Sequence, residues 1–249
     1  MFDLSHYNIS DSAAVYELKS LELQSLPKQI FVKRENLKLK EPSKEIENEV
    51  KMYTILKDHN IQHIAPTFYG QIEKGLVIEV ALGSLGNLSY QMAETSKHKY
   101  LLSFVKRLST CLNLLHGLGI VHRDIKPDNI LYFKDYRLVL CDFGFSFEEL
   151  CMGSPYWMAP ENHRNIMTKE SDIWSLGLSL LYFCFNDTII MNGIGQCSSI
   201  LKEDSNFPDN ELKNVLFDDI IKRTRDSVIA IDAIWDMLHF DPMKRKLLM

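Results

Sequence analysis

Three side chains in the middle of the chain have the types and the spacing that phosphoryl chemistry requires. Asp124 and Asn129 lie in the run from His122 to Asn129, and Asp142 follows thirteen residues after Asn129. A carboxylate can accept the proton of a hydroxyl group, and carboxylate and amide oxygens are the ligands that Mg²⁺ prefers. Catalysis of phosphoryl transfer is mostly positioning and charge neutralisation, so this set of residues predicts that reaction.

A short β-hairpin is predicted to bring the two loops together. Residues 130–133 and 137–141 read as strands, and a turn at Lys134 and Asp135 joins them. Taken singly, an Asn or an Asp in a loop is usually only a turn former. Because the hairpin separates Asn129 from Asp142, we expect these two side chains to converge on one metal ion.

Composition limits the class of protein. The 249 residues fit two lobes that share one cleft, and a hydrophobic fraction of 46% with 24% charged residues is ordinary for a globular protein. A net charge of −5 does not indicate a nucleic-acid partner. The five cysteines are scattered, the first residues do not resemble a signal peptide, and no apolar run is long enough for a membrane segment. We therefore expect a cytoplasmic protein.

The first part of the chain is predicted to form a small antiparallel sheet with one helix. Strands are expected at residues 14–18, 29–33, 67–72 and 75–81. Ser43 is expected to cap a helix whose apolar residues recur at helical spacing, namely Ile46, Val50, Tyr53 and Leu56. The stretch 83–86, with two glycines, is expected to be a short, flexible connection at the lobe boundary.

The remainder is predicted to be mainly helical. Apolar residues between Lys99 and Leu118 form one helical stripe, which Gly117 and Gly119 end. Further helices are expected at residues 172–185, 211–222 and 227–239.

The two loops match the pattern H-R-D-x-x-x-x-N followed by D-F-G, and the chain resembles the eukaryotic-type protein kinase family over nearly all its length. The segment from Gly153 to Glu161 resembles the family segment that ends in A-P-E, and Ile30 to Lys33 lie where the family has V-A-I-K. The resemblance implies one domain, residues 1–249, with the α+β, bilobal protein-kinase fold. The N-lobe, a sheet plus the αC helix, would span about 1–80, the hinge about 79–86, and the mainly helical C-lobe about 87–249.

The resemblance also implies roles for the loop residues. Asp124 would accept the proton of the substrate hydroxyl, and Lys126 would neutralise the transferring phosphoryl group. Asn129 and Asp142 would hold Mg²⁺, or Mn²⁺ in its place. Lys126 and Ser154 together favour serine and threonine as acceptors, because tyrosine kinases usually lack this lysine.

ATP is the nucleotide that the resemblance implies. Lys33 would hold its α- and β-phosphates with Glu49 as ion-pair partner, and Glu45, one helical turn earlier, is the alternative partner. An exposed pair of these types contributes only about 0–1 kcal/mol, so the pairing alone does not prove function. The other predicted nucleotide-binding residues are Val15, Ile78, Glu79, Ala81 and Leu131.

Other residues are expected to have structural or regulatory roles. They are Arg123, Phe143, Glu161, Asp172 and Arg245. Glu161 and Arg245 resemble a buried ion pair of the family, and Asp172 resembles an aspartate that binds the backbone of the catalytic loop. Four rings are expected to stack into a column between the lobes, and an ordinary core would explain the same residues: Tyr53, Phe68, His122 and Phe143.

Two departures from the family pattern affect the nucleotide pocket. Asn8, Ser10 and Ala13 stand where the family has the glycines of a phosphate-covering loop, so we expect poorer cover over the phosphates. Phe31 stands where V-A-I-K has alanine. Its ring either fills the space of adenine, which costs about 1–3 kcal/mol or more, or turns toward the core of the lobe and leaves the pocket open.

The segment after Gly144 carries two acidic residues where activated kinases often carry a phosphate. We hypothesise that Glu148 or Glu149 pairs with Arg123, so that no activating phosphorylation is needed. A solvated acidic bend explains the same residues equally well. Ser146 is the one phosphorylatable residue between Gly144 and Gly153.

Three functions remain open at this point. The leading prediction is a serine/threonine protein kinase that uses ATP and Mg²⁺ and acts on a protein substrate. Phe31 and the missing glycines favour the alternative, a pseudokinase that binds a protein partner. A small-molecule phosphotransferase is the weakest, since the segment from Pro155 to Glu161 resembles one that presents a polypeptide.

Overall fold

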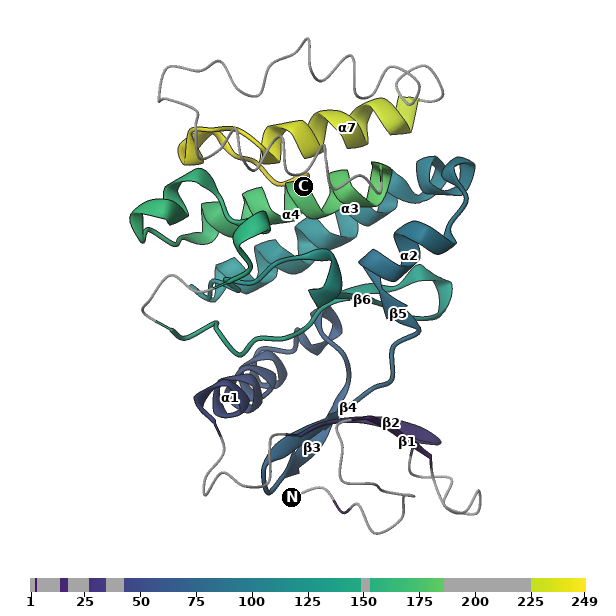
Figure 1. Ribbon diagram of the computed structural model, residues 1–249, viewed down its shortest axis with the longest axis vertical. Coiled ribbons are helices and arrows are strands. Elements are labelled where there is room, and N and C mark those ends of the chain that lie inside the picture. The colour runs from purple at the N-terminus through teal and green to yellow at the C-terminus, as the bar shows by residue number, and fades with distance from the viewer. Residues whose placement is uncertain (1–2, 4–13, 18–26, 35–42, 149–152, 186–224) are drawn as a thin grey trace.

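A four-stranded antiparallel sheet and one long helix form the lower lobe in Figure 1, and the upper lobe is mainly helical. The computed structural model describes residues 3, 14–17, 27–34, 43–148, 153–185 and 225–249. Within them, the predicted α+β, two-lobed fold is confirmed. The positions predicted for a glycine loop, Asn8, Ser10 and Ala13, and the helix predicted at 211–222 lie outside the described residues.

The sheet of the N-lobe has the strand order β1-β2-β4-β3. Its strands are β1 (Ala14–Glu17), β2 (Gln29–Arg34), β3 (Phe68–Ile72) and β4 (Gly75–Ile78). Side chains alternate along β2: Ile30 and Val32 are fully buried on one face, so Phe31 and Lys33 lie on the other. Four of the predicted strands are thus confirmed, with ends that differ by a few residues.

Helix α1 (Lys44–Asp58) begins where its sequence predicts. Ser43 Oγ accepts a hydrogen bond from the Ile46 amide at 3.4 Å, which confirms the predicted N-cap. The buried face of the helix carries Ile46, Tyr53 and Leu56, at the spacing of a helix that packs one stripe against a core.

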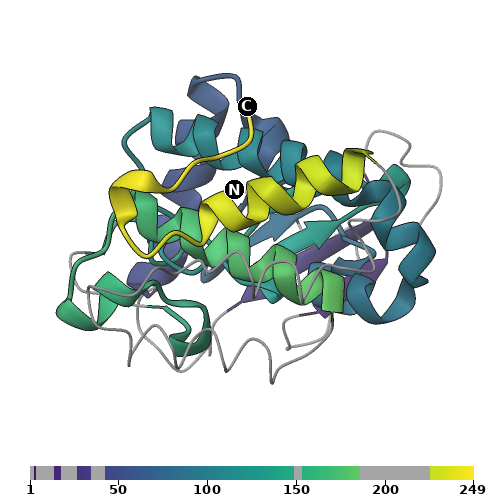
Figure 2. The ribbon, with the colours of Figure 1, turned by 90° about the horizontal axis from the view of Figure 1, so that it is seen from above.

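Three long helices form the core of the C-lobe. They are α3 (Glu94–Gly117), α4 (Lys169–Phe185) and α7 (Arg225–Met237). Each contacts the other two, and Figure 2 shows α7 lying over the other two helices. In the part of the chain that the structure describes, no helix combines the length and the apolar character needed to cross a membrane.

A small sheet lies between these helices and the N-lobe. Its order is β5-β6-β7, with β5 at Gly83–Ser84, β6 at Ile130–Tyr132 and β7 at Leu138–Leu140. The predicted hairpin is confirmed. The short 3₁₀ helices are Gln62–Ile64, Pro127–Asn129, Lys134–Tyr136, Pro155–Trp157, Pro160–Arg164 and Pro242–Lys244.

One sequence prediction about the lobe boundary was wrong. Residues 83–86 are not a flexible connection, because Gly83 and Ser84 pair with β6 and helix α2 (Leu85–Gln91) begins directly after them. Ser84 and Asn87 form a capping box at the start of that helix. This capping box starts a helix at Leu85, although the two glycines had suggested a flexible segment. The chain therefore crosses between the lobes at residues 79–82.

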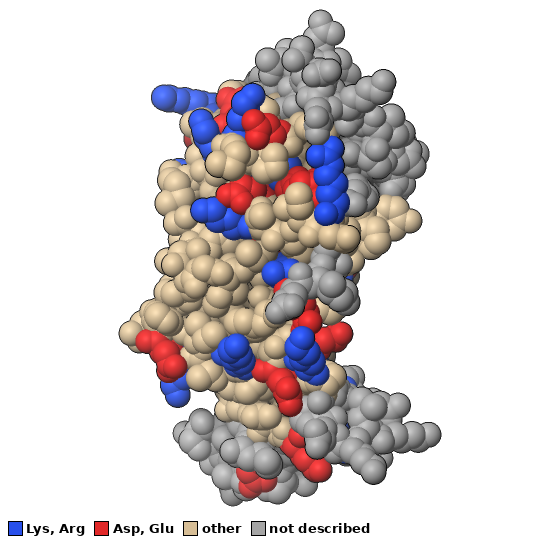
Figure 3. Space-filling model, turned by 90° about the vertical axis from the view of Figure 1, so that its left-hand side faces the viewer, with Lys and Arg blue, Asp and Glu red and all other residues tan. Residues whose placement is uncertain are grey.

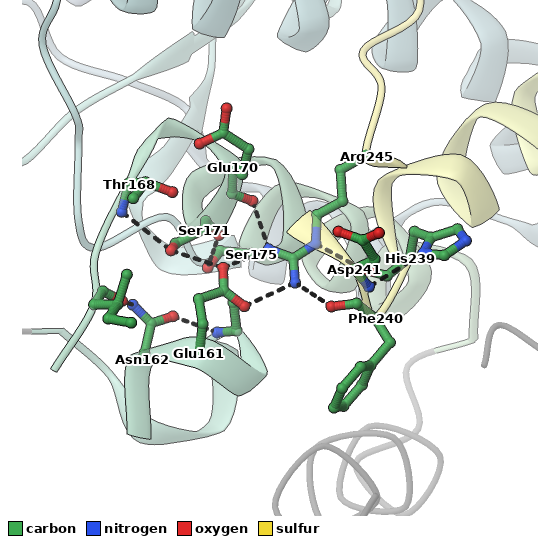
Figure 4. Close-up of polar contacts among 12 residues, drawn as sticks. Glu161, Asn162, Thr168, Glu170, Ser171, Ser175, His239, Phe240, Asp241 and Arg245 are labelled. Carbon is green, nitrogen blue, oxygen red and sulfur yellow. Dashed lines mark hydrogen bonds and ion pairs between the residues drawn. The ribbon is translucent and has the colours of Figure 1, made fainter. Parts of the chain in front are cut away.

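A buried ion pair joins the segment before α4 to the end of the chain (Figure 4). Arg245 donates two hydrogen bonds to the Glu161 carboxylate, at 2.6 and 2.8 Å, and further ones to the carbonyls of His239, Phe240 and Glu170. Ser171 Oγ donates to the same carboxylate at 3.0 Å. Because each of the five donors of the guanidinium has an acceptor, the charge is tolerated inside the lobe.

We expect Arg245→Met to destabilise the protein by about 3–5 kcal/mol, because Glu161 would keep its charge and lose its main partner. Urea unfolding, followed by circular dichroism, measures the change. Lys244→Met is the matched control, since Lys244 is largely exposed and lies 4.0 Å from Asp241. Equal unfolding midpoints for the two variants would show that the ion pair contributes little.

Candidate functional site

Lys33 connects three elements at the junction of the lobes. Its Nζ donates to Glu49 Oε2 of α1 at 2.6 Å and to Asp142 Oδ1 at 2.7 Å. Glu49 is only 2% exposed and lies on the same buried helix face as the apolar residues of α1. Of the two predicted partners, Glu49 pairs with Lys33, whereas Glu45 packs against Gly144.

The opposite charges of Lys33 and Asp142 stabilise each other. Burial opposes the charge on Lys33, but the carboxylates of Glu49 and Asp142 outweigh it and raise the pKa of Lys33 above its usual range. Burial would raise the pKa of Asp142, yet the ammonium group of Lys33 outweighs it and holds that pKa below its usual range. Both groups are therefore charged at neutral pH.

Asp124 accepts hydrogen bonds on both carboxylate oxygens. Lys126 Nζ donates to Oδ2 at 2.7 Å, and Asn129 Nδ2 donates to the same oxygen at 2.9 Å. The amide and the hydroxyl of Ser154 donate to Oδ1, at 3.0 and 2.9 Å, and Lys126 Nζ also reaches Ser154 Oγ at 2.9 Å. A serine hydroxyl therefore already lies between the acid and the lysine in this structure.

Asp172 of α4 binds the backbone of this loop. Its carboxylate accepts from the amides of His122, at 2.7 Å, and Arg123, at 2.9 Å, and it contacts His116 Nε2 at 2.9 Å. Arg123 has φ of +74°, a backbone conformation that is rare for residues other than glycine. The two hydrogen bonds that these backbone amides donate to Asp172 support this strained conformation.

Asp124 and Asp142 lie on the same side of the molecule. His122 Nε2 lies 3.0 Å from the carbonyl oxygen of Cys141, and since a carbonyl only accepts, this nitrogen carries the proton. Burial lowers the pKa of His122, so the ring is neutral. The Cys141 amide also donates to the carbonyl of Asn129 at 3.0 Å, so the hairpin brings the two loops together as predicted.

The oxygens available at this point fit Mg²⁺. Asp142 offers a carboxylate whose side chain is 42% exposed, and Asn129 turns its amide nitrogen toward Asp124, which leaves its oxygen on the opposite side. Among the described residues there is no cluster of three or more His, Cys, Asp or Glu side chains that could hold a metal alone. This donor set suits an ion that substrate phosphates also coordinate.

The predicted nucleotide-binding residues lie along the sheet and the hinge. Phe31 is paired in register with Val15 of β1 and with Ile78 of β4, so its ring and Ile78 share the sheet face that carries Lys33. Phe31 therefore lies on the side of the sheet from which Lys33 reaches Asp142, and it is partly buried against the core.

The other described residues of this set lie in the hinge and in the small sheet. The Glu79 amide donates to the Thr67 carbonyl at 2.9 Å, and its carboxylate binds Arg137 Nη2 at 2.6 Å, so this part of the hinge is tied to both lobes. Ala81 is partly exposed in the hinge. Leu131 lies on β6, opposite Ser84 of β5 and Val139 of β7.

The predicted column of rings runs continuously between the lobes. Tyr53 stacks on Phe68 at 4.9 Å between ring centroids and meets Phe143 edge-on at 5.9 Å. Phe143 lies 5.0 Å from the ring of His122. The column fixes Phe143, and thereby the neighbouring Asp142, relative to both α1 and the loop of His122.

Glu148, one of the two acidic residues considered as a partner of Arg123, forms its hydrogen bonds with α1, and the charge of Arg123 also helps to lower its pKa. Glu148 binds Lys44 Nζ at 2.8 Å and accepts from Asn48 Nδ2 at 3.0 Å, so its closest partners belong to α1 rather than to the loop of Arg123. Glu149 lies outside the described residues. Sequence reasoning missed Asn48, although a polar residue beside Glu49 on the buried side of a predicted helix was a usable signal.

Comparison with known proteins agrees with this geometry. The model of the protein kinase domain matches residues 12–248. Calcium-dependent protein kinase SK5 of Glycine max is 30% identical over 162 residues, covering 60% of this chain and 32% of the relative. Serine/threonine-protein kinase ppk34 of Schizosaccharomyces pombe is 40% identical over 91 residues, covering 32% and 26%.

A third relative matches over a longer stretch. Calcium/calmodulin-dependent protein kinase type 1 of Macrobrachium nipponense is 27% identical over 183 residues, covering 67% of this chain and 52% of the relative. The matches span between about a quarter and a half of these relatives. Since the domain model matches nearly the whole chain, this protein belongs to the protein kinase family.

Proposed function

We propose that this chain is a serine/threonine protein kinase, which transfers the γ-phosphoryl group of ATP to a hydroxyl group of a protein. The observation that carries the proposal is the position of Lys33, bonded to Glu49 at 2.6 Å and to Asp142 at 2.7 Å. Active protein kinases need this lysine–glutamate pair and the metal-binding aspartate in place together.

Each residue of the site has a part in the proposed reaction. Lys33 binds the α- and β-phosphates, and Asp124 orients the acceptor hydroxyl and takes its proton. Lys126, at 2.7 Å from Asp124, neutralises charge on the transferring group. Asp142 and Asn129 would hold Mg²⁺, whose charge would neutralise the phosphate oxygens.

Serine or threonine is the proposed acceptor. Ser154 Oγ lies 2.9 Å from both Asp124 Oδ1 and Lys126 Nζ, so these two groups accommodate an aliphatic hydroxyl between them. The neighbouring Tyr156 is 71% exposed, which leaves surface beside Ser154 for a polypeptide. Relatives whose names include serine/threonine-protein kinase support the same acceptor class.

The alternative is a pseudokinase, a binding module with weak or no ATP binding. The orientation of Phe31 favours it, because the ring shares the cleft face of the sheet with Lys33 and Ile78. A ring on this face competes for space with the adenine of ATP.

Asp142→Asn is expected to lower the rate of phosphoryl transfer about a hundredfold or more, because it removes both a metal ligand and the charge beside Lys33. Incorporation of labelled phosphate into peptides with Ser, Thr or Tyr acceptors measures the rate. Asp135→Asn is the matched control, since Asp135 lies exposed in the turn between β6 and β7. Transfer by Asp142→Asn at the wild-type rate, or no transfer by the wild type, would refute the proposal.

Phe31→Ala is expected to tighten ATP binding about tenfold, because removing the ring relieves the overpacking of the nucleotide pocket. Isothermal titration with MgATP measures the dissociation constant. Phe31→Tyr keeps the ring and should bind ATP as the wild type does. An unchanged constant in Phe31→Ala would show that the ring leaves the pocket free, whereas binding by this variant alone would favour the pseudokinase.

A further inference from the structure

Helix α1 contacts the turn that follows Asp142 through one buried amide. Asn48 Nδ2 donates to the carbonyl of Gly144 at 2.7 Å and to Glu148 Oε1 at 3.0 Å. Asn48 is only 7% exposed. An amide nitrogen has two protons, so this one side chain can satisfy a backbone carbonyl and a carboxylate at the same time.

The carboxylate of Glu148 completes the contact. Its second oxygen binds Lys44 Nζ at 2.8 Å, one helical turn before Asn48. The hydrogen bond from Lys44, followed by the one from Asn48, lowers the pKa of Glu148, so the group is ionised at neutral pH. Two tight turns lie in the segment that ends at Glu148 beside α1. In the first, the Ser146 amide donates to the carbonyl of Phe143, and in the second the Glu148 amide donates to the carbonyl of Phe145.

Two further contacts extend this junction along the same side of α1. Gly144 packs closely against Glu45, since a Cβ atom at Gly144 would lie 3.2 Å from Cβ of Glu45. Lys51 Nζ lies 4.1 Å above the ring of Phe147. The side of the molecule on which α1 lies shows acidic and basic side chains interleaved at the height of this helix (Figure 3), which suits such paired contacts.

The position of Asn48 in the helix gives the contact its importance. The next residue, Glu49, holds Lys33, while Asn48 holds the carbonyl two residues after Asp142. One turn of α1 therefore fixes both partners of the Lys33–Asp142 ion pair. In the described part of the segment, Ser146 is buried, so its hydroxyl is not presented to a modifying enzyme.

We propose that Asn48 is a positioning residue for Asp142, and that the carboxylate of Glu148 binds the segment to α1 without any modification. Asn48 and Lys44 hold the segment from Gly144 to Glu148 on α1, so Asp142 stays beside Lys33 while the segment is unmodified. The inference rests on the proposed kinase function for its consequence in catalysis. The contact itself can be tested without activity.

The first test measures hydrogen exchange in the nucleotide-free protein, with intact mass showing that no phosphate is attached. Asn48→Leu keeps a side chain of similar size but has no donor for Gly144 or Glu148. We expect the amides of residues 143–148 to exchange about tenfold faster, because the hydrogen bonds that hold this segment are lost. Glu47→Ala, an exposed neighbour on α1, is the control. Unchanged exchange in Asn48→Leu overturns the proposal.

The second test uses charge reversal and separates positioning from a general effect on stability. Glu148→Lys should raise the Mg²⁺ concentration needed for half-maximal transfer and lower kcat about tenfold, through loss of charge-assisted hydrogen bonds. The double variant Lys44→Glu/Glu148→Lys should bring both the Mg²⁺ requirement and kcat most of the way back to the wild-type values. A merely structural role would lower the melting temperature and leave the Mg²⁺ dependence unchanged, and that result overturns the proposal.

Failure of the proposed function has a different outcome. If the wild type transfers no phosphate but Asn48→Leu speeds exchange at residues 143–148, the kinase proposal fails and the role of Asn48 in holding Asp142 stands. Suppose instead that the wild type transfers phosphate while it carries none itself, and that the variants match it in amide hydrogen exchange and in Mg²⁺ dependence. The kinase proposal then stands and the role of Asn48 fails.

Discussion

The arrangement of the site depends on one partly buried ammonium group. Lys33 lies on a strand of the N-lobe, Glu49 on α1 and Asp142 at the end of the hairpin, and the lysine binds both carboxylates. Withdrawing any of the three charges from water is costly unless it is paired. The sheet, the helix and the hairpin must therefore keep their relative positions for these charges to be tolerated, and this requirement couples the two lobes.

The C-lobe supplies the fixed frame for this coupling. Asp172 accepts hydrogen bonds from the backbone amides of His122 and Arg123 and so stabilises a loop with an unfavourable φ at Arg123. The helix that carries Asp172 is in turn connected to the end of the chain, where Arg245 binds the carbonyl of Glu170 and the carboxylate of Glu161. A site that neutralises phosphate charge needs such rigidity, because its groups act through position.

Much of this could be predicted from local pattern. The hairpin, the Ser43 cap and the stripe of α1 follow from strand propensity, capping and helical periodicity, which act over a few residues. Residues 83–86 were assigned wrongly because glycines suggest flexibility, whereas pairing with β6 decides their structure. Asn48 was missed because its partners, Gly144 and Glu148, are about a hundred residues away.

The sequence by itself determined the family, the order of the elements and the chemical types at the site, since these depend on residue identity and spacing along the chain. The tertiary structure decided which charges meet. It paired Lys33 with Glu49 rather than Glu45, brought Glu148 to Lys44 and set Phe31 opposite Ile78. These outcomes depend on helix rotation, strand register and the approach of distant segments, and a difference of one residue in any of them moves a side chain to another face.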